Sequence, residues 1–199
     1  MNYQLLLDRI YQSVDSQAYF TPTGSIPSSQ RDAMQEIAVV LGQPDFDADN
    51  VRALARRLHG AGRIDRVRYL SALHVIEAHP RVANWAEAAR LAGEQEMAAL
   101  ELGGPDLQYN LAAVERHRGV LAFMRNQYEV ALDYFSRALE RERSSENLQN
   151  VLCALLRLGE EADARSLLEM IRRSYPAEIV TSLNASVARD PDLALLREE

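Results

Sequence analysis

Apolar residues recur every three or four positions along most of this chain. Near the N-terminus the recurrence is regular, with apolar side chains at Tyr3, Leu6, Leu7, Ile10, Tyr11 and Val14. That spacing places them on one face of an amphipathic helix. No stretch shows the alternation of apolar and polar residues that marks a strand. The sequence therefore predicts an all-α fold.

Glycine, proline and short polar residues separate these apolar-periodic stretches, as they do between helices. We expect Ser28 or Ser29 to cap one helix and Asp49 or Asn50 to cap another. The longest irregular segment covers residues 19–29. The expected helices cover about residues 2–16, 28–41, 49–59, 65–78, 82–102, 106–125, 127–142, 144–158 and 160–174, and residues 177–199 fit one further helix with a short tail.

Small and bulky positions repeat in the second half of the chain. Ala131 is followed four positions later by Phe135 and seven positions later by Ala138. Asn126, a residue type that tolerates a left-handed backbone, lies at the turn before this helix. The matching positions 33 residues after Asn126, Ala131 and Phe135 are Gly159, Ala164 and Leu168.

This pattern resembles the tetratricopeptide repeat family. The resemblance implies antiparallel helix pairs stacked as a short right-handed solenoid, in which small residues let the two backbones approach. It is best supported over residues 107–176. We expect an N-terminal helical region in residues 1–62, repeat-like helix pairs in 63–176, and a capping helix with a tail in 177–199, because the last apolar face of a stack must be covered.

The resemblance also implies a binding surface. Members of the family hold peptide segments or helices of partner proteins in a concave groove lined by the first helix of each pair. The polar segment 19–29, with the helix before it, is expected either to fold back over this groove or to act as a partner-binding arm. Carried over by position, the groove residues are Arg116, Val120, Phe123, Glu146, Gln149, Asn150, Cys153 and Arg157.

The charge balance bears on the kind of partner. The net charge is −7, which disfavours non-specific binding to nucleic acid. Residues 85–97 have the small-residue spacing of a helix-turn-helix, but Glu94, Glu96 and Glu101 would repel phosphate. All 22 basic residues are arginine, which indicates a GC-rich, bacterial genome; escape from lysine-directed modification is the alternative.

Arginines concentrate in one part of this acidic chain. They either pair with surface carboxylates or form a docking patch for an acidic partner or a phosphate group. The candidate patch consists of Arg52, Arg56, Arg57, Arg63 and Arg66, with Arg68 beside it.

No motif indicates a metal, a cofactor or an enzyme. The four histidines, His59, His74, His79 and His117, lack the spacing and the companion cysteines of zinc sites, and we expect them to be solvated or partly buried. Asp45, Asp47 and Asp49 alternate as in a calcium loop, but the glycine and the distal glutamate of that loop are missing. Cys153 fits a small apolar filler better than a nucleophile.

The sequence therefore predicts a non-enzymatic adaptor, assembly factor or dedicated chaperone. A regulatory subunit that controls an enzyme or a transcription factor bound in trans is the alternative, and an enzyme with a scattered site remains a third. We expect a cytoplasmic protein, since residues 1–16 lack the pattern of a signal peptide and no stretch reaches the length of a membrane span. A homodimer through the last helix is a further expectation.

Overall fold

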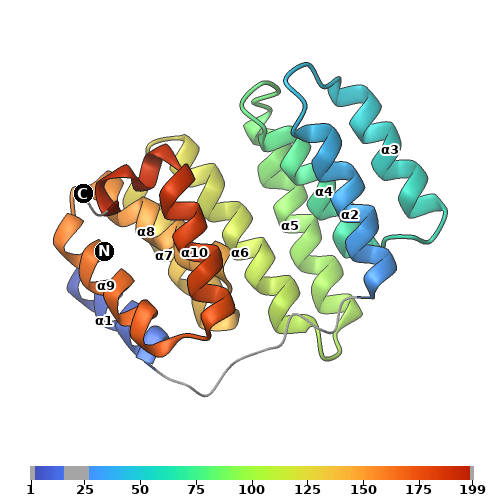
Figure 1. Ribbon diagram of the computed structural model, residues 1–199. Coiled ribbons are helices and arrows are strands. Elements are labelled where there is room, and N and C mark those ends of the chain that lie inside the picture. The colour runs from blue at the N-terminus through green and yellow to red at the C-terminus, as the bar shows by residue number, and fades with distance from the viewer. Residues whose placement is uncertain (1–2, 16–26, 198–199) are drawn as a thin grey trace. The chain divides into compact units, whose positions relative to one another are not determined.

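The fold is entirely helical in the part of the chain that the structure, a computed structural model, describes: residues 3–15 and 27–197. Helices account for 81% of the residues, no strand is present in the described ranges, and adjacent helices pack in pairs (Figure 1). The all-α prediction is confirmed, and the pairing is that of an α-helical repeat fold. The helices are α1 (Tyr3–Asp15), α2 (Ser28–Leu41), α3 (Ala48–Gly60), α4 (Arg66–Ala78), α5 (Trp85–Leu102), α6 (Leu107–Met124), α7 (Tyr128–Arg141), α8 (Ser145–Leu158), α9 (Glu161–Ser174), α10 (Ala177–Arg189) and the 3₁₀ helix η1 (Pro191–Leu196).

The chain forms two compact units. The central unit is Pro22–Leu121, and the terminal unit combines Met1–Thr21 with Ala122–Glu199. This division differs from the expected boundaries after residues 62 and 176. The reason is that α1 packs against α7 and α9, so the two ends of the chain share one core.

Two clusters of buried side chains hold the central unit together. In the first, α2, α3 and α4 contribute Ala33, Ile37, Val51, Ala55, Leu58, Ala72 and Ile76, together with Ile64 from the turn. In the second, Val67 and Leu70 of α4 pack against Leu91, Ala98 and Ala99 of α5. Alanines such as Ala92 and Ala99 are fully buried, and their small side chains allow the backbones of α4 and α5 to approach closely.

Helix α8 is the centre of the terminal unit. It contacts α7, α9, α10 and η1, and Leu148, Val151, Leu152 and Leu155 have no exposed surface. A helix that is apolar around most of its circumference is stable only when neighbours surround it. Four of the apolar residues in the C-terminal region are buried with it: Leu183, Val187, Leu193 and Leu196.

The positions that define the repeat are buried in both of its copies. Ala131 and Ala164 have no exposed surface, and Phe135 and Leu168 are 2% and 3% exposed. The two turns also match, because Asn126 and Gly159 both have a left-handed backbone, with φ of 59° and 85°. A left-handed residue at this position closes the helix and reverses the chain.

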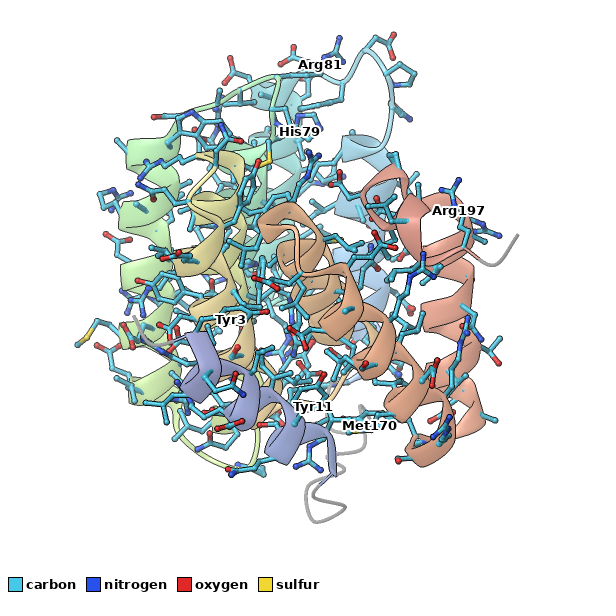
Figure 2. The ribbon with its side chains drawn as sticks, turned by 90° about the vertical axis from the view of Figure 1, so that its left-hand side faces the viewer. Tyr3, Tyr11, His79, Arg81, Met170 and Arg197 are labelled. Carbon is cyan, nitrogen blue, oxygen red and sulfur yellow. The ribbon has the colours of Figure 1, made fainter. Side chains whose placement is uncertain are left out.

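Helix α1 lies on the second helices of the two repeat-like pairs. Its apolar face, Leu6, Leu7, Ile10 and Val14, is buried. Tyr3 projects from this helix (Figure 2), and its hydroxyl donates to the Asp163 carboxylate of α9 at 3.0 Å. Arg9 forms an ion pair with Glu140 of α7 at 2.7 Å. This helix therefore does not lie on α8, to which the resemblance assigns the groove. Most of the irregular segment 19–29 lies outside the described residues.

Three helix starts differ from the expected ones. The cap of α3 is Asp47, whose side chain accepts hydrogen bonds from the backbone N–H groups of Asp49 and Asn50. Helix α2 follows Pro27 rather than a serine cap. Helix α5 begins at Trp85, because the chain turns between α4 and α5 with a positive φ of 51° at Ala83.

None of the helices in the described ranges has the length and apolar character that a membrane span requires.

Candidate functional site

A pocket of about 430 Å³ lies on the central unit where α3, α4 and α5 meet. Helix α4 contributes Tyr69, Leu73 and Glu77, which are spaced four residues apart and so share one face of that helix. Helices α3 and α5 supply the two sides. The complete lining is Arg52, Arg56, Tyr69, Leu73, Glu77, Asn84, Glu87 and Leu91.

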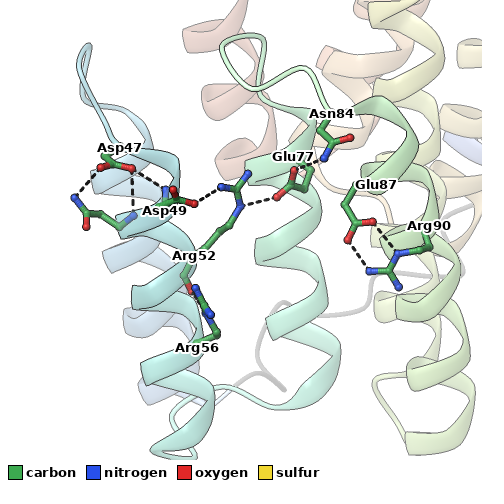
Figure 3. A network of polar contacts seen from close by, with 9 residues as sticks. Asp47, Asp49, Arg52, Arg56, Glu77, Asn84, Glu87 and Arg90 are labelled. Atoms are coloured by element: carbon green, nitrogen blue, oxygen red, sulfur yellow. Dashed lines mark hydrogen bonds and ion pairs between the residues drawn. The ribbon is translucent and has the colours of Figure 1, made fainter.

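A buried carboxylate organises one end of the pocket. Glu77 is 5% exposed; it accepts a hydrogen bond from Arg52 at 2.7 Å and another from the Asn84 amide at 3.0 Å (Figure 3). Arg52 also pairs with Asp49 at 2.7 Å. The hydrogen bond to Glu77 raises the pKa of Arg52 above its ordinary value, so its guanidinium stays charged. Both partners of Arg52 are carboxylates, and its charge is therefore already compensated inside the protein.

Arg56 is in a different situation. Its Nε donates to the backbone carbonyl of Arg52 at 3.4 Å, and its side chain is exposed. In the described part of the chain, no carboxylate pairs with Arg56. The pocket therefore presents one arginine whose charge is not neutralised by a neighbour.

The opposite side of the pocket carries a paired carboxylate, whose arginine partner, Arg90, also pairs with Glu94. Glu87 of α5 pairs with Arg90, whose Nε lies 2.8 Å from the carboxylate, and this hydrogen bond lowers the pKa of Glu87. Between the two sides lie the apolar side chains of Leu73 and Leu91.

Tyr69 adds a polar group beside this apolar surface. Its ring stacks on His59 with centroids 4.7 Å apart, and its hydroxyl has no hydrogen-bond partner within the described ranges. A tyrosine held by its ring with an unpaired hydroxyl is suited to recognising a ligand that has both an apolar and a polar part.

The arginine patch expected from the sequence is divided among several sites. Arg52 and Arg56 line the pocket. Arg57 and Arg63 both pair with Glu36, at 3.6 and 3.0 Å. Arg66 pairs with Glu101 of α5 at 3.1 Å, and Arg68 pairs with Asp65.

The expected groove residues on α8 face another part of the same chain. Gln149 donates to Asp190 at 2.8 Å, and Arg157 pairs with Asp192. Cys153 lies between them along α8 and is 7% exposed. Glu146 is exposed and Asn150 is half-buried.

The expected groove residues on α6 are not gathered in one unit. Phe123 belongs to the terminal unit, where its ring contacts Tyr128 and Phe135. Arg116 and Val120 belong to the central unit and are half-buried. The structure thus brings Gln149, Cys153 and Arg157 together on α8, and it does not gather the whole set within either unit.

Two histidines expected to be solvated or partly buried form a buried pair in the central unit. The rings of His74 and His117 stack with centroids 4.1 Å apart. The Nδ1–H of His74 donates to the Ala88 carbonyl, 2.8 Å away, and the Nδ1 of His117 contacts the Gln95 side-chain oxygen at 2.9 Å. No group of three or more histidine, cysteine or acidic side chains in the described ranges is placed to hold a metal ion.

Most of the residues that line the pocket were not expected from the sequence. Apolar and polar residues at the spacing of Tyr69, Leu73 and Glu77 occur in any amphipathic helix. Their positions in the sequence therefore do not mark them as residues of a pocket. One signal was present: Glu77 lies in the otherwise apolar run Val75-Ile76-Glu77-Ala78. A carboxylate there is expected to be buried and paired.

No protein-family model, no curated protein and no solved structure matches this chain.

Proposed function

We propose that this protein is a non-enzymatic helical interaction module, an adaptor, assembly factor or dedicated chaperone of the cytoplasm, that docks a segment of a partner protein in the pocket of α3, α4 and α5. The observation that carries the proposal is the uncompensated Arg56 beside an apolar surface in that pocket. Its volume of about 430 Å³ lies within the range of ligand sites in proteins.

The chemistry of the pocket favours a partner segment with an acidic residue next to an apolar one. A carboxylate placed at Arg56 would form a charge-assisted hydrogen bond, which is among the stronger polar contacts available to a protein. An apolar side chain one or two positions away would cover Leu73 and Leu91. The Tyr69 hydroxyl would donate to a carbonyl or carboxylate oxygen of the same segment.

The buried network keeps Arg52 from competing for this carboxylate. Because Arg52 is paired with Glu77 and Asp49, its side chain is held in place at the edge of the pocket. It does not offer a second unpaired charge to the ligand. A phosphate group carries about two negative charges at neutral pH, and one uncompensated arginine suits a single carboxylate better.

We further propose that the terminal unit is of the tetratricopeptide type. The support is the 33-residue spacing between Asn126 and Gly159, together with the burial of Ala131, Ala164 and the bulky residues that follow each of them.

The test begins with a display library of random 12-residue peptides selected against the full chain. Binding of the selected peptides is then measured by fluorescence anisotropy with the wild-type protein, Arg56→Gln and Arg57→Gln. Losing a charged hydrogen bond costs about 1.5–3 kcal/mol, so we expect Arg56→Gln to weaken binding about tenfold or more.

Arg57→Gln is the matched control, because Arg57 is the next residue of the same helix but does not line the pocket. We expect the affinity of Arg57→Gln for the selected peptides to stay within about twofold of wild type. The substitution removes only an exposed ion pair with Glu36, and such pairs contribute little to stability. Selected peptides without acidic residues, or equal affinities for wild type and Arg56→Gln, would contradict the proposal.

A further inference from the structure

The end of the chain folds back onto α8. After α10, Asp190 caps η1 by accepting a hydrogen bond from the Asp192 backbone at 2.9 Å, and η1 then contacts α8, α9 and α10. The side chains of Leu193 and Leu196 are buried against these helices and are 0% and 2% exposed. We call residues 190–197 the C-terminal segment.

Polar side chains of α8 and α9 bind this segment from outside. Gln149 donates to Asp190 at 2.8 Å, and Arg157 pairs with Asp192. Arg165 of α9 donates to the backbone carbonyl of Leu195. These are side chains that recognise carboxylates and a main-chain carbonyl, in the manner of a protein that holds a peptide segment.

Gln149, Cys153 and Arg157 recur every four residues and so lie on one face of α8. We call the surface formed by these three side chains the α8 face, and two of them bind carboxylates of the C-terminal segment. The C-terminal segment covers it: Cys153 is 7% exposed, and burial, with the nearby carboxylates of Asp190 and Asp192, raises the pKa of its thiol to about 12.

The segment depends on this surface for its conformation. It is a six-residue 3₁₀ helix, longer than the three or four residues over which such helices are usually found. Its remaining contacts bind it to the end of α10, where Arg197 donates to the carbonyls of Val187 at 3.1 Å and Asp190 at 3.0 Å. Because it follows α10 in chain order and belongs to none of the helix pairs, its release would leave those pairs intact.

We propose that the α8 face is a second partner-binding surface, which the C-terminal segment occupies as an internal ligand. The partner it fits is a protein segment of the same chemistry: two acidic residues in the order Asp-x-Asp, followed by leucines at the first and fourth positions after them. Such a segment displaces residues 190–197. This surface belongs to the terminal unit and does not depend on the pocket of the central unit.

The arrangement sets a threshold for binding. The tethered segment competes with a partner at an effective concentration in the millimolar range. The apparent affinity of the partner is therefore its intrinsic affinity multiplied by the fraction of molecules in which the α8 face is open. Substitutions that release the segment therefore strengthen binding of an external ligand.

The experiment uses the full chain and a fluorescent peptide with the sequence of residues 188–199. The releasing variant carries Asp192→Arg and Leu193→Ala, which remove one ion pair and one buried side chain. We expect it to bind the peptide at least tenfold more tightly than wild type. A peptide with asparagine in place of both aspartates should bind at least tenfold more weakly to the variant.

Cys153 provides a second readout because it is the sole cysteine of the chain. Its reaction with Ellman's reagent should be at least tenfold faster in the releasing variant and should slow again when the peptide is added. Leu195→Ser is the control variant, since Leu195 belongs to the same segment but is 55% exposed; its thiol reaction and peptide affinity should equal those of wild type.

A third measurement needs no substitution and stands if the releasing variant fails to fold. The rate of Cys153 labelling in wild type is followed in increasing urea below the unfolding transition. Release of the segment exposes little surface, so we expect labelling to depend weakly on urea. Labelling that follows global unfolding would overturn the proposal, and so would equal peptide affinities for wild type and a folded releasing variant. A wild-type dimer that the same substitutions abolish would identify a second copy as the occupant and would also overturn it.

Discussion

The interior of the central unit determines the protonation state of two stacked histidines. His74 and His117 are 1% and 7% exposed, and in the described part of the chain the Nε2 atom of His74 has no hydrogen-bond partner. Burial lowers the pKa of both rings. At His74 the hydrogen bond to Ala88 opposes this shift with a smaller effect, and at His117 the charges of His74 and Arg116 lower the pKa further. Both rings are therefore neutral in the folded protein.

This pair predicts a loss of stability in mild acid. An unfolded histidine has a pKa of about 6.5, whereas the folded rings bind protons only at lower pH. The stability that the neutral pair contributes is present above about pH 6.5 and is lost as the pH falls from there toward the folded pKa values. Urea unfolding at pH 7.5, 6.5 and 5.5 measures how the free energy of unfolding changes with pH.

His117→Asn is the comparison, because an asparagine amide places an N–H near the position of the ring Nδ1 that contacts Gln95. We expect the variant to be less stable at every pH but to lose less stability between pH 7.5 and 5.5. The same decrease in both proteins would show that the ring pair does not cause it.

Sequence reasoning at the residue scale succeeded where a local conformation decides the residue. Asn126 and Gly159 were expected at matching turns, Asn126 as a residue that tolerates a left-handed backbone, and both have a positive φ. The histidine pair was missed, because His74 and His117 are far apart in the sequence and only the packing of α4 against α6 brings their rings together.

At the scale of elements, the period of apolar residues located the helices but not all of their neighbours. The pattern in residues 3–14 indicates a buried face, which the structure confirms for Leu6, Leu7 and Ile10. It contains no information on what covers that face. The covering helices are α7 and α9, more than a hundred residues away, so α1 belongs to the terminal unit instead of the N-terminal region expected from the sequence.

This placement of α1 predicts different costs for two neighbouring leucines. Leu6 is 4% exposed and Leu5 is 61% exposed. We expect Leu6→Ala to reduce the free energy of unfolding by about 2–5 kcal/mol through lost burial and a cavity. Leu5→Ala should change it by less than about 0.5 kcal/mol, as surface substitutions usually do.

Urea denaturation followed by circular dichroism gives both values. Equal, small effects of the two substitutions would mean that α1 does not pack on the terminal unit in solution.

At the scale of the whole molecule, the arginines expected to form one basic patch mostly serve to hold helices together. Glu36 binds two of them, Glu101 binds Arg66, and Glu77 with Asp49 binds Arg52. The sequence shows that the arginines are near one another, but it does not show which carboxylates meet them. Arg56 is left without a carboxylate partner in the described ranges because the face of α3 that carries it opens onto the pocket.

The net charge also limits how an acidic partner is recognised. At −7, the protein as a whole repels an acidic segment at long range. Attraction must come from contacts at close distance, where Arg56 and the apolar lining of the pocket act together. Recognition of the acidic segment therefore depends on one pair of charges, Arg56 and the carboxylate of the partner.

A charge-reversal cycle on that pair shows whether Arg56 and the partner's carboxylate are in contact. A selected peptide with a single acidic residue is compared with its arginine-substituted form, each against wild type and Arg56→Glu, by fluorescence anisotropy. We expect either change alone to weaken binding at least tenfold, and the two changes together to restore the affinity to within about threefold of the original pair. If the losses of binding energy from the two substitutions add, and the doubly reversed pair recovers no affinity, Arg56 does not contact the acidic residue of the peptide.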